Sequence, residues 1–185
     1  MLTGMQSGFT KYCCFLCLWD SRATMHHYTR TSWPVRQQFS PGKQNISNKP
    51  LIDPQDVLLP PLHIKLGLVK NFVKALDRDG PAFQYLATKF PKISSAKIKE
   101  RIFVGPQIRE LIDDKQFSQH LSATETAWTS FKKVVREFLG NRKSDNYRQI
   151  VADLLENYRR IGVRMSLKLH FLHSHLEFSR KTWAK

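Results

Sequence analysis

Two neighbouring stretches of sequence decide the fold class: TETAWTSFKKVVREFLG (Thr124–Gly140) and DNYRQIVADLLENYRRIG (Asp145–Gly162). In each stretch, apolar residues recur at intervals of three and four, the spacing of one face of an α-helix. A terminal glycine is typical of a helix C-terminus, and Asp145 can cap the second helix. The pattern predicts two amphipathic helices with buried stripes Trp128, Phe131, Val135, Phe138 and Leu139, and Tyr147, Ile150, Val151, Leu154, Leu155 and Tyr158.

The same periodicity predicts further helices on both sides of this pair. A helix is expected over Leu62–Asp77, and proline, glycine and serine punctuate shorter ones over Pro81–Lys89, Ser95–Arg101 and Gly105–Asp114. The last helix is expected over Ser166–Phe178. Strand patterns are weak throughout. The predicted fold class is therefore mainly α, an irregular helical bundle preceded by an N-terminal cysteine-containing turn and loop.

Composition divides the chain into three segments. Residues 1–50 hold all three cysteines, the pair His26-His27 and a polar loop, and residues 51–178 form the expected helical domain. Residues 179–185, Ser-Arg-Lys-Thr-Trp-Ala-Lys, are a short separate tail.

The chain is strongly basic, with 30 Lys and Arg against 15 Asp and Glu, a formal net charge of +15 and a pI near 10.0. This charge favours a polyanionic partner, nucleic acid first, over an acidic small molecule. A basic surface that only solvates the protein is the alternative. No window approaches the roughly 20 apolar residues of a membrane span. Three closely spaced cysteines suit a reducing compartment, so we expect no membrane partner and a location in the nucleus or cytoplasm.

Two short motifs near opposite ends of the chain offer metal ligands. Cys14 and Cys17 form a C-x2-C pair, and His170, His173 and His175 lie near the C-terminus. Two thiolates and two imidazoles make a tetrahedral zinc site, so zinc is the predicted cofactor and would staple the two ends together. The alternative is that the cysteines are small buried apolar residues and the histidines lie on the surface or in the core.

Helix geometry bears on which histidines could share the metal. Residues three apart lie on one face, which favours His170 with His173, whereas residues five apart point roughly 140° away from each other. His170 and His175 can share a metal only if the helix ends, bulges or tightens between them. A rival local site is offered by His26 and His27, and His63 is a further candidate.

Three runs resemble an uncharacterised, multicopy family of arthropod mobile-element proteins: GFTKYCCFLCLWDSR (Gly8–Arg22), LLPPLHIKLGL (Leu58–Leu68) and KLHFLHSHL (Lys168–Leu176). The resemblance covers nearly the whole chain. More widely, a C-x2-C followed much later by H-x4-H resembles the mainly helical zinc-binding insertion of RNase H-like (DDE-type) transposases related to the vertebrate recombination-activating recombinase. Carried over by position, that resemblance implies the ligands Cys14, Cys17, His170 and His175.

The resemblance also implies a fragment without catalytic residues. Such transposases hold two divalent metals with three separated carboxylates, one before the C-x2-C and the last after the H-x4-H. The flanks within residues 1–185 are too short to contain them, and Asp113, Asp114 and Glu125 are interpreted as helix caps and surface charge. The family continues with Phe-Pro-Glu-Asn where this chain has its 179–185 tail. A shifted reading frame would explain that tail, and Trp183 is then expected to be exposed or disordered.

The expected function is that of a non-catalytic, zinc-binding and DNA-contacting region of a DNA transposase-like protein. Besides DNA, the expected partners are a second copy of the chain or the remainder of a transposase. The alternative is a protein-interaction module or an inactive transposon relic without nucleic-acid binding. An RNA-binding protein is a third hypothesis, but the stacking aromatics of RNA-recognition motifs are not evident. The residues expected to contact DNA phosphates are Lys132, Lys133, Arg136, Arg142, Lys143, Arg159 and Arg160.

Overall fold

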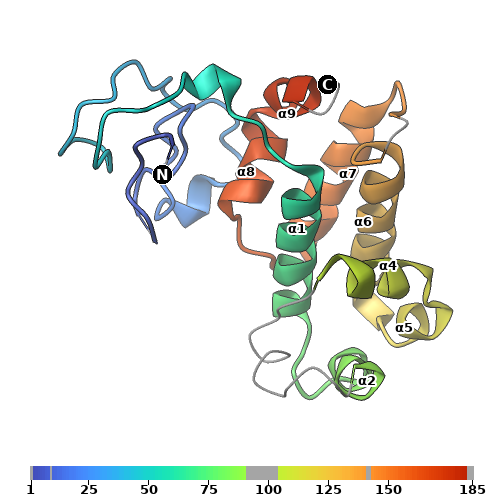
Figure 1. The fold of residues 1–185 in the computed structure, drawn as a ribbon. Helices are drawn as coiled ribbons and strands as arrows, with labels where there is room; N and C mark the ends of the chain where they lie inside the picture. The colour runs from blue at the N-terminus through green and yellow to red at the C-terminus, as the bar shows by residue number, and fades with distance from the viewer. Residues whose placement is uncertain (1, 9, 91–103, 141–142, 183–185) are drawn as a thin grey trace. The chain divides into compact units, whose positions relative to one another are not determined.

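The computed structural model describes residues 2–8, 10–90, 104–140 and 143–182 (Figure 1). In this part of the chain no strand occurs, and β-pairing is limited to isolated bridges between Met5 and Ile46 and between Cys17 and Val35. The predicted mainly α fold class is confirmed. In chain order the elements are the 3-10 turns η1 (Thr24–His26) and η2 (Pro54–Asp56), then α1 (Pro61–Ala75), α2 (Pro81–Lys89), α4 (Gly105–Asp113), α5 (Lys115–Gln119), the 3-10 turn η3 (Ser122–Thr124), α6 (Glu125–Glu137), α7 (Tyr147–Arg160), α8 (Leu167–Ser174) and α9 (Leu176–Thr182).

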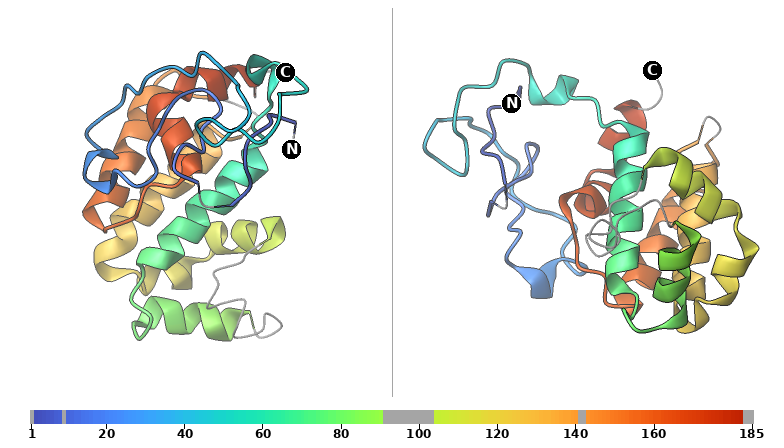
Figure 2. Two further views of the ribbon diagram at one scale, coloured as in Figure 1. Left: turned by 90° about the vertical axis from the view of Figure 1, so that its left-hand side faces the viewer. Right: turned by 60° about the horizontal axis from the view of Figure 1, so that its bottom comes forward.

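The chain forms two compact units. The terminal unit joins residues Met1–Pro60 to Met165–Lys185, and the central unit consists of Pro61–Arg164. The first 60 residues of the terminal unit run mostly as loops (Figure 2). Helices α8 and α9, which were expected to continue the domain of residues 51–178, are therefore grouped with the N-terminal segment.

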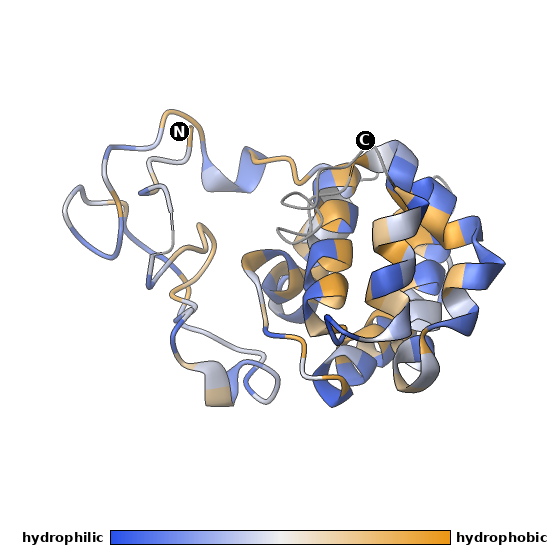
Figure 3. Ribbon diagram, turned by 90° about the horizontal axis from the view of Figure 1, so that it is seen from below, coloured by the Kyte–Doolittle hydropathy of each residue, from blue (hydrophilic) through white to orange (hydrophobic). Residues whose placement is uncertain are grey.

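The predicted pair of helices packs together in the central unit. Helices α6 and α7 are antiparallel, because Asn157 donates to the Ser130 hydroxyl at 2.7 Å while the rings of Phe138 and Tyr147 stack at 5.5 Å. Every residue of the two predicted apolar stripes is buried. Hydrophobic and hydrophilic residues alternate along the helices of this unit, as amphipathic helices require (Figure 3).

Trp128 of α6 anchors the core of the central unit. Its ring centroid lies 5.1 Å from Phe72 of α1, 5.1 Å from Phe117 of α5 and 5.0 Å from Phe131. All four side chains are fully buried. Burial of each such aromatic side chain contributes about 1.5–3 kcal/mol, so this cluster is a main source of the unit's stability.

Gly162 follows the end of α7 as predicted, whereas α6 ends at Glu137, three residues before Gly140. Gly162 adopts φ +73°, a left-handed conformation that glycine accepts without a steric penalty, and the Val163 N–H closes the last turn of α7 onto the Tyr158 carbonyl at 2.9 Å. A Cβ at Gly140 would lie 2.7 Å from the Arg136 carbonyl oxygen. The predicted cap at Asp145 is wrong, because α7 begins at Tyr147 and Asn146 occupies the N-cap position.

The other helices agree with the prediction in most places. Helix α2 begins and ends where the prolines predicted, and α1 and α4 lie within two residues of their expected bounds. The expected helix Ser95–Arg101 and residue Trp183 lie outside the described residues. Helix α5 was not expected, and the predicted helix Ser166–Phe178 is broken at His175 into α8 and α9.

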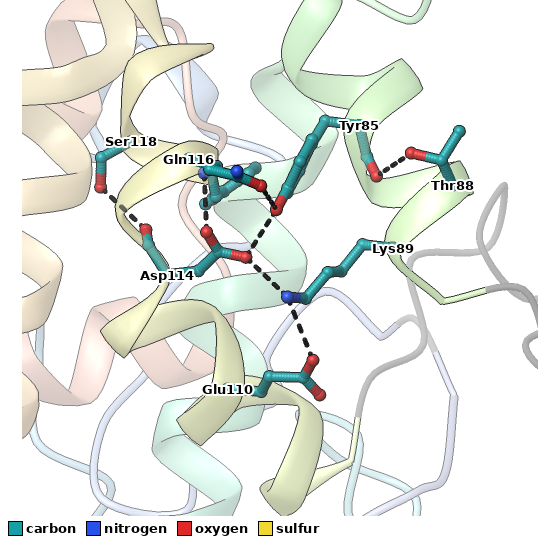
Figure 4. Close-up of polar contacts among 8 residues, drawn as sticks. Tyr85, Thr88, Lys89, Glu110, Asp114, Gln116 and Ser118 are labelled. Carbon is teal, nitrogen blue, oxygen red and sulfur yellow. Dashed lines mark hydrogen bonds and ion pairs between the residues drawn. The ribbon is translucent and has the colours of Figure 1, made fainter.

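A cluster of polar contacts around Asp114 ties α2, α4 and α5 together (Figure 4). The carboxylate caps α5 by accepting from the Phe117 N–H at 3.0 Å, accepts from the Tyr85 hydroxyl at 2.8 Å and pairs with Lys89 at 3.0 Å. Lys89 also reaches Glu110 at 3.3 Å. Burial raises the pKa of Asp114, but these donors outweigh it and leave the pKa below its usual value. The interpretation of Asp114 as a helix cap is confirmed.

In the described part of the chain, no helix combines the length and the apolar character that crossing a membrane requires.

Candidate metal centre

A tight loop in the terminal unit presents the two predicted cysteine ligands. Cys14 and Cys17 are both buried. The backbone on either side of Cys17 pairs with a second segment, because the Leu18 N–H donates to the Pro34 carbonyl at 2.8 Å and the Arg36 N–H to the Leu16 carbonyl at 3.1 Å. This pairing fixes the cysteine loop without any regular sheet.

The buried guanidinium of Arg36 holds the same loop from the side. Its Nε donates to the Cys14 carbonyl at 3.1 Å, Nη2 to the Tyr12 carbonyl at 3.1 Å and Nη1 to the Gln44 carbonyl at 3.2 Å. The Arg36 residue is only 5% exposed. One side chain therefore connects the loop that carries the thiols to the segment around Gln44, a role that the sequence patterns did not reveal.

The histidine ligands come from the end of α8. The Ser166 hydroxyl caps the start of this helix by accepting from the Leu169 N–H at 3.4 Å, and His170 lies one turn further on. The helix ends at Ser174, and His175 occupies its C-cap with φ −133° and ψ 39°. This departure from helical geometry brings the rings of His170 and His175 to 5.0 Å between centroids. The helix thus ends between the two residues, the condition for their sharing a metal.

These four side chains converge. The candidate ligand atoms of Cys14, Cys17, His170 and His175 all lie within 4.8 Å of one another. The Cys17 Sγ lies 3.2 Å from Nε2 of both histidines, and the Cys14 Sγ lies 3.7 Å from Nε2 of His175. Bond lengths of tetrahedral zinc place its ligand atoms about 3.3–3.8 Å apart, so the observed spacing could hold such an ion.

The electrostatics of the group favour the forms that bind a metal. Hydrogen bonds from Cys14 and from the two imidazoles lower the pKa of Cys17 to about 3, against the opposing effect of burial. Burial raises the pKa of Cys14 and lowers that of His170. These directions favour a thiolate at Cys17 beside a neutral His170, and a bound cation would displace the proton of Cys14.

The orientation of His170 also fits a ligand role. Its Nε2 faces the thiols, and its buried Nδ1 has no hydrogen-bond partner among the described residues. The indole ring of Trp19 stacks on the imidazole at 4.6 Å and 10°. Packing against Trp19 thus fixes the orientation of the His170 ring. In many metal sites a hydrogen bond to the second imidazole nitrogen has this role instead.

Two neighbours of the ligands lie outside this group. His173, which regular helix geometry favoured as the partner of His170, turns its ring toward Tyr28 at 6.5 Å and its Nδ1 toward the Ser174 hydroxyl at 3.4 Å. Cys13 is half-buried, and burial raises its pKa to about 11. Cys13 and His173 are therefore residues of a metal-binding type that lie next to the candidate ligands but do not belong to the site.

The rival histidines do not converge either. His27 is buried, donates to the Asp20 carbonyl at 2.8 Å and packs its ring 4.9 Å from Trp19, which is a structural role. His26 and His63 are exposed, and neither belongs to a group of metal ligands among the described residues.

The residues expected to contact DNA lie on or near α6 and α7. Most have partners in the protein: Arg136 pairs with Asp113 at 3.0 Å, and Glu156 pairs with both Arg159 and Arg160, at 2.9 and 3.0 Å. Lys132 reaches the Ser118 hydroxyl at 3.5 Å, Lys133 is exposed and Lys143 is partly exposed. Arg142 lies outside the described residues.

Two segments of the chain match known domain families. The family described as domain of unknown function DUF8703 matches residues 1–52, and domain of unknown function DUF8704 matches residues 61–140. Neither match covers half of the 185 residues. No curated protein and no solved structure matches the chain. The gap between the two matches includes Pro60, where the first segment of the terminal unit ends.

Proposed function

We propose that this chain is a zinc-stapled, DNA-binding module without a catalytic centre, of the kind expected in a transposase-like protein. The observation that carries the zinc assignment is the convergence of two buried thiols and two imidazoles from segments 153 residues apart. Four protein ligands complete the tetrahedral sphere of zinc, which is the arrangement of structural rather than catalytic sites.

The donor set determines the choice of metal. Thiolate and imidazole select zinc over magnesium and calcium, which prefer oxygen ligands. Among its described residues, the first segment of the terminal unit has only the short turns η1 and η2 as helical structure. A structural zinc ion would contribute folding free energy directly, because the site does not exist in the unfolded chain.

Metal analysis of the purified chain tests the zinc assignment. We expect about one zinc per chain, and cobalt should replace it with the visible absorption of tetrahedral thiolate coordination. Cys14→Ser and His170→Ala should each lose the metal, whereas the matched control Cys13→Ser should keep it. Absence of zinc after expression in zinc-supplemented medium would contradict the proposal.

The charge supports DNA as the partner. A net charge of +15 on 185 residues gives the positive potential that attracts a phosphate backbone. We expect weak binding to duplex DNA, with slight sequence preference and an affinity that falls steeply between about 50 and 200 mM salt. Fluorescence anisotropy across this range tests it. No binding at low salt would favour the protein-interaction alternative. A DNA partner favours the nucleus over the cytoplasm as the proposed location.

The acidic residues support a non-catalytic module. Asp113 pairs with Arg136, Asp114 caps α5, and Glu125 lies in the first turn of α6, where it complements the helix dipole. Each of these acidic residues thus has a structural role. Within the described residues, the one convergent group of metal ligands consists of Cys14, Cys17, His170 and His175.

A further inference from the structure

We propose that the main DNA-contacting surface is the solvent face of α1, marked by His63, Lys70 and Lys74, rather than the basic ends of α6 and α7. The proposal rests on the DNA binding proposed above and identifies where on the central unit the phosphates would bind.

Three arginines of α6 and α7 have carboxylate partners within the protein, whereas Lys132 and Lys133 have no ion pair among the described residues. Glu156 receives a bidentate contact from Arg159, at 2.9 Å for both bonds, and a further bond from Arg160 at 3.0 Å. The hydrogen bond from Arg159, reinforced by Arg160, lowers the pKa of Glu156 to about 2. Arg136 is likewise paired with Asp113. A guanidinium already bound to a carboxylate must share or lose that partner before it can contact phosphate.

Helix α1 differs because it contains no acidic residue. Its 15 residues include three lysines and one histidine. Lys70 and Lys74 are exposed and one turn apart, and neither has an ion pair within the described residues. Like charges at this spacing destabilise an isolated helix, a cost that a bound polyanion removes.

The three marker residues form one row. Because successive helical residues are rotated by about 100° around the helix axis, positions 63, 70 and 74 lie within an arc of about 40° on one side of the helix. The row extends over about 16 Å, at about 1.5 Å per residue. All three side chains are exposed. A DNA backbone following this row would meet positive or neutral groups on α1 and no carboxylate of that helix.

A second basic pair lies on another side of α1. Lys65 of α1 is half-buried, and burial together with the nearby positive charge of Arg109 on α4 lowers its pKa. No ion pair of either residue occurs in the described part of the chain. At about 100° per residue, Lys65 lies about 160° around α1 from His63, so Lys65 and Arg109 are a separate basic pair and not part of the row.

Matched neutral substitutions test the proposal in the full zinc-loaded chain. Lys70→Gln with Lys74→Gln removes two positive charges from α1, and Arg159→Gln with Arg160→Gln removes two from α7. Salt dependence of binding to one duplex is measured for each variant. The slope of log K against log salt is negative, and the α1 variant should make it shallower by about 1.8, at about 0.9 per lost phosphate contact. The α7 variant should leave the slope nearly unchanged.

Each outcome separates this proposal from the one on which it rests. An unsubstituted chain that fails to bind duplex DNA at low salt would overturn both. Binding by the unsubstituted chain, with an equal or larger loss of slope in the α7 variant, would overturn the α1 assignment and leave DNA binding intact. Tighter binding of duplex RNA than of duplex DNA of equal length would overturn the choice of occupant. Unchanged zinc content and circular dichroism in both variants confirm that their folds are comparable.

Discussion

His175 reaches the other three candidate metal ligands because α8, the helix that carries His170, ends at Ser174. At the C-cap, His175 places Nε2 3.2 Å from the Cys17 sulfur, whereas His173 remains on α8 and faces Tyr28. We predict that His175→Ala weakens zinc affinity by more than about 100-fold, beyond the usual effect of changing a residue that only supports a ligand. The matched change His173→Ala should leave zinc affinity within a few-fold of the original.

Competition for zinc with a coloured chelator measures both variants. The expected result is loss of metal from the His175 variant alone, with a changed cobalt spectrum. Equal losses in the two variants, or a loss confined to the His173 variant, would show that the helix does not end where the structure places its end.

Arg36 has a structural role that no sequence pattern predicted. Its three hydrogen bonds to the carbonyls of Tyr12, Cys14 and Gln44 span two loop segments, and a compact lysine ammonium cannot reach all three. We predict that Arg36→Lys destabilises the chain by at least about 2 kcal/mol, because a buried carbonyl left without its donor carries a desolvation penalty.

Urea unfolding with zinc present measures this loss. Arg30→Lys is the control, because Arg30 is exposed and lies over the Trp33 ring at 4.5 Å, and its effect should stay within about 0.5 kcal/mol. Similar unfolding midpoints for the Arg36 variant and the unsubstituted chain would contradict the structural role assigned to Arg36.

At the scale of elements, the sequence predicted the helices whose ends carry a local signal. Pro81 begins α2 and Gly162 follows the end of α7, because proline and glycine cannot continue a helix without cost. Helix α5 escaped prediction because it has five residues and a single buried side chain, Phe117, so no periodicity could develop.

The break between α8 and α9 could not be predicted for a different reason. Neither glycine nor proline occurs between Leu167 and Phe178, and the apolar spacing continues through the segment. The break is defined by tertiary contacts, in which His175 turns toward Cys17 while the ring of Phe171 packs 5.3 Å from Phe15. The C-x2-C pair and His170 could therefore be proposed from spacing, whereas the choice of His175 over His173 needed the resemblance to a family.

The Asp114 cluster gives a prediction about the joining of α2, α4 and α5. Asp114→Asn keeps a side chain that can cap α5 but removes the charge that Lys89 contacts at 3.0 Å, and the Asp114 side chain is only 7% exposed. We predict a loss of about 1–3 kcal/mol in the free energy of unfolding at pH 7. Glu110→Gln, which removes the more exposed arm of the same network, should cost less.

The pH dependence of this loss follows from the lowered pKa of Asp114. A carboxyl whose pKa is lower in the folded state stabilises the fold above its unfolded pKa, near 3.9, and this contribution disappears as the pH falls through the folded value. The stability difference between the original chain and Asp114→Asn should therefore be constant from about pH 7 to pH 5 and shrink below pH 4. A difference that instead widens on acidification would contradict the ion pair.

At the scale of the whole molecule, the two units should respond differently to loss of metal. The four candidate ligands all belong to the terminal unit, whereas the central unit has the Trp128 core and no convergent group of metal ligands among its described residues. We predict that a chelator accelerates amide hydrogen exchange in the Cys14 loop and in α8 by at least about tenfold, while amides in α6 and α7 keep their protection. Cys14→Ser should reproduce this pattern without a chelator. Uniform loss of protection across both units would show that zinc stabilises them as one cooperative structure.

The last prediction concerns catalysis, and it follows from what the candidate ligands and the carboxylates do in the fold. Cleavage of a phosphodiester by a transposase needs two hard cations held by converging carboxylates. The candidate site here offers two thiolates and two imidazoles, which select zinc and fill its coordination sphere, so no position remains for an activated water. Asp113 and Asp114 are committed to Arg136, Lys89 and the start of α5.

We therefore expect that the zinc-loaded chain neither nicks nor joins DNA with magnesium or manganese, even at salt concentrations where it binds. A supercoiled plasmid assay over hours gives the measurement, and Asp114→Asn serves as the control for contaminating nuclease. Cleavage by the unsubstituted chain that disappears when Asp113, Asp114 or Glu125 is replaced would place a catalytic centre in the central unit. Cleavage of equal rate in every variant would instead identify a contaminant, because a carboxylate that holds a catalytic metal cannot be replaced without loss of rate.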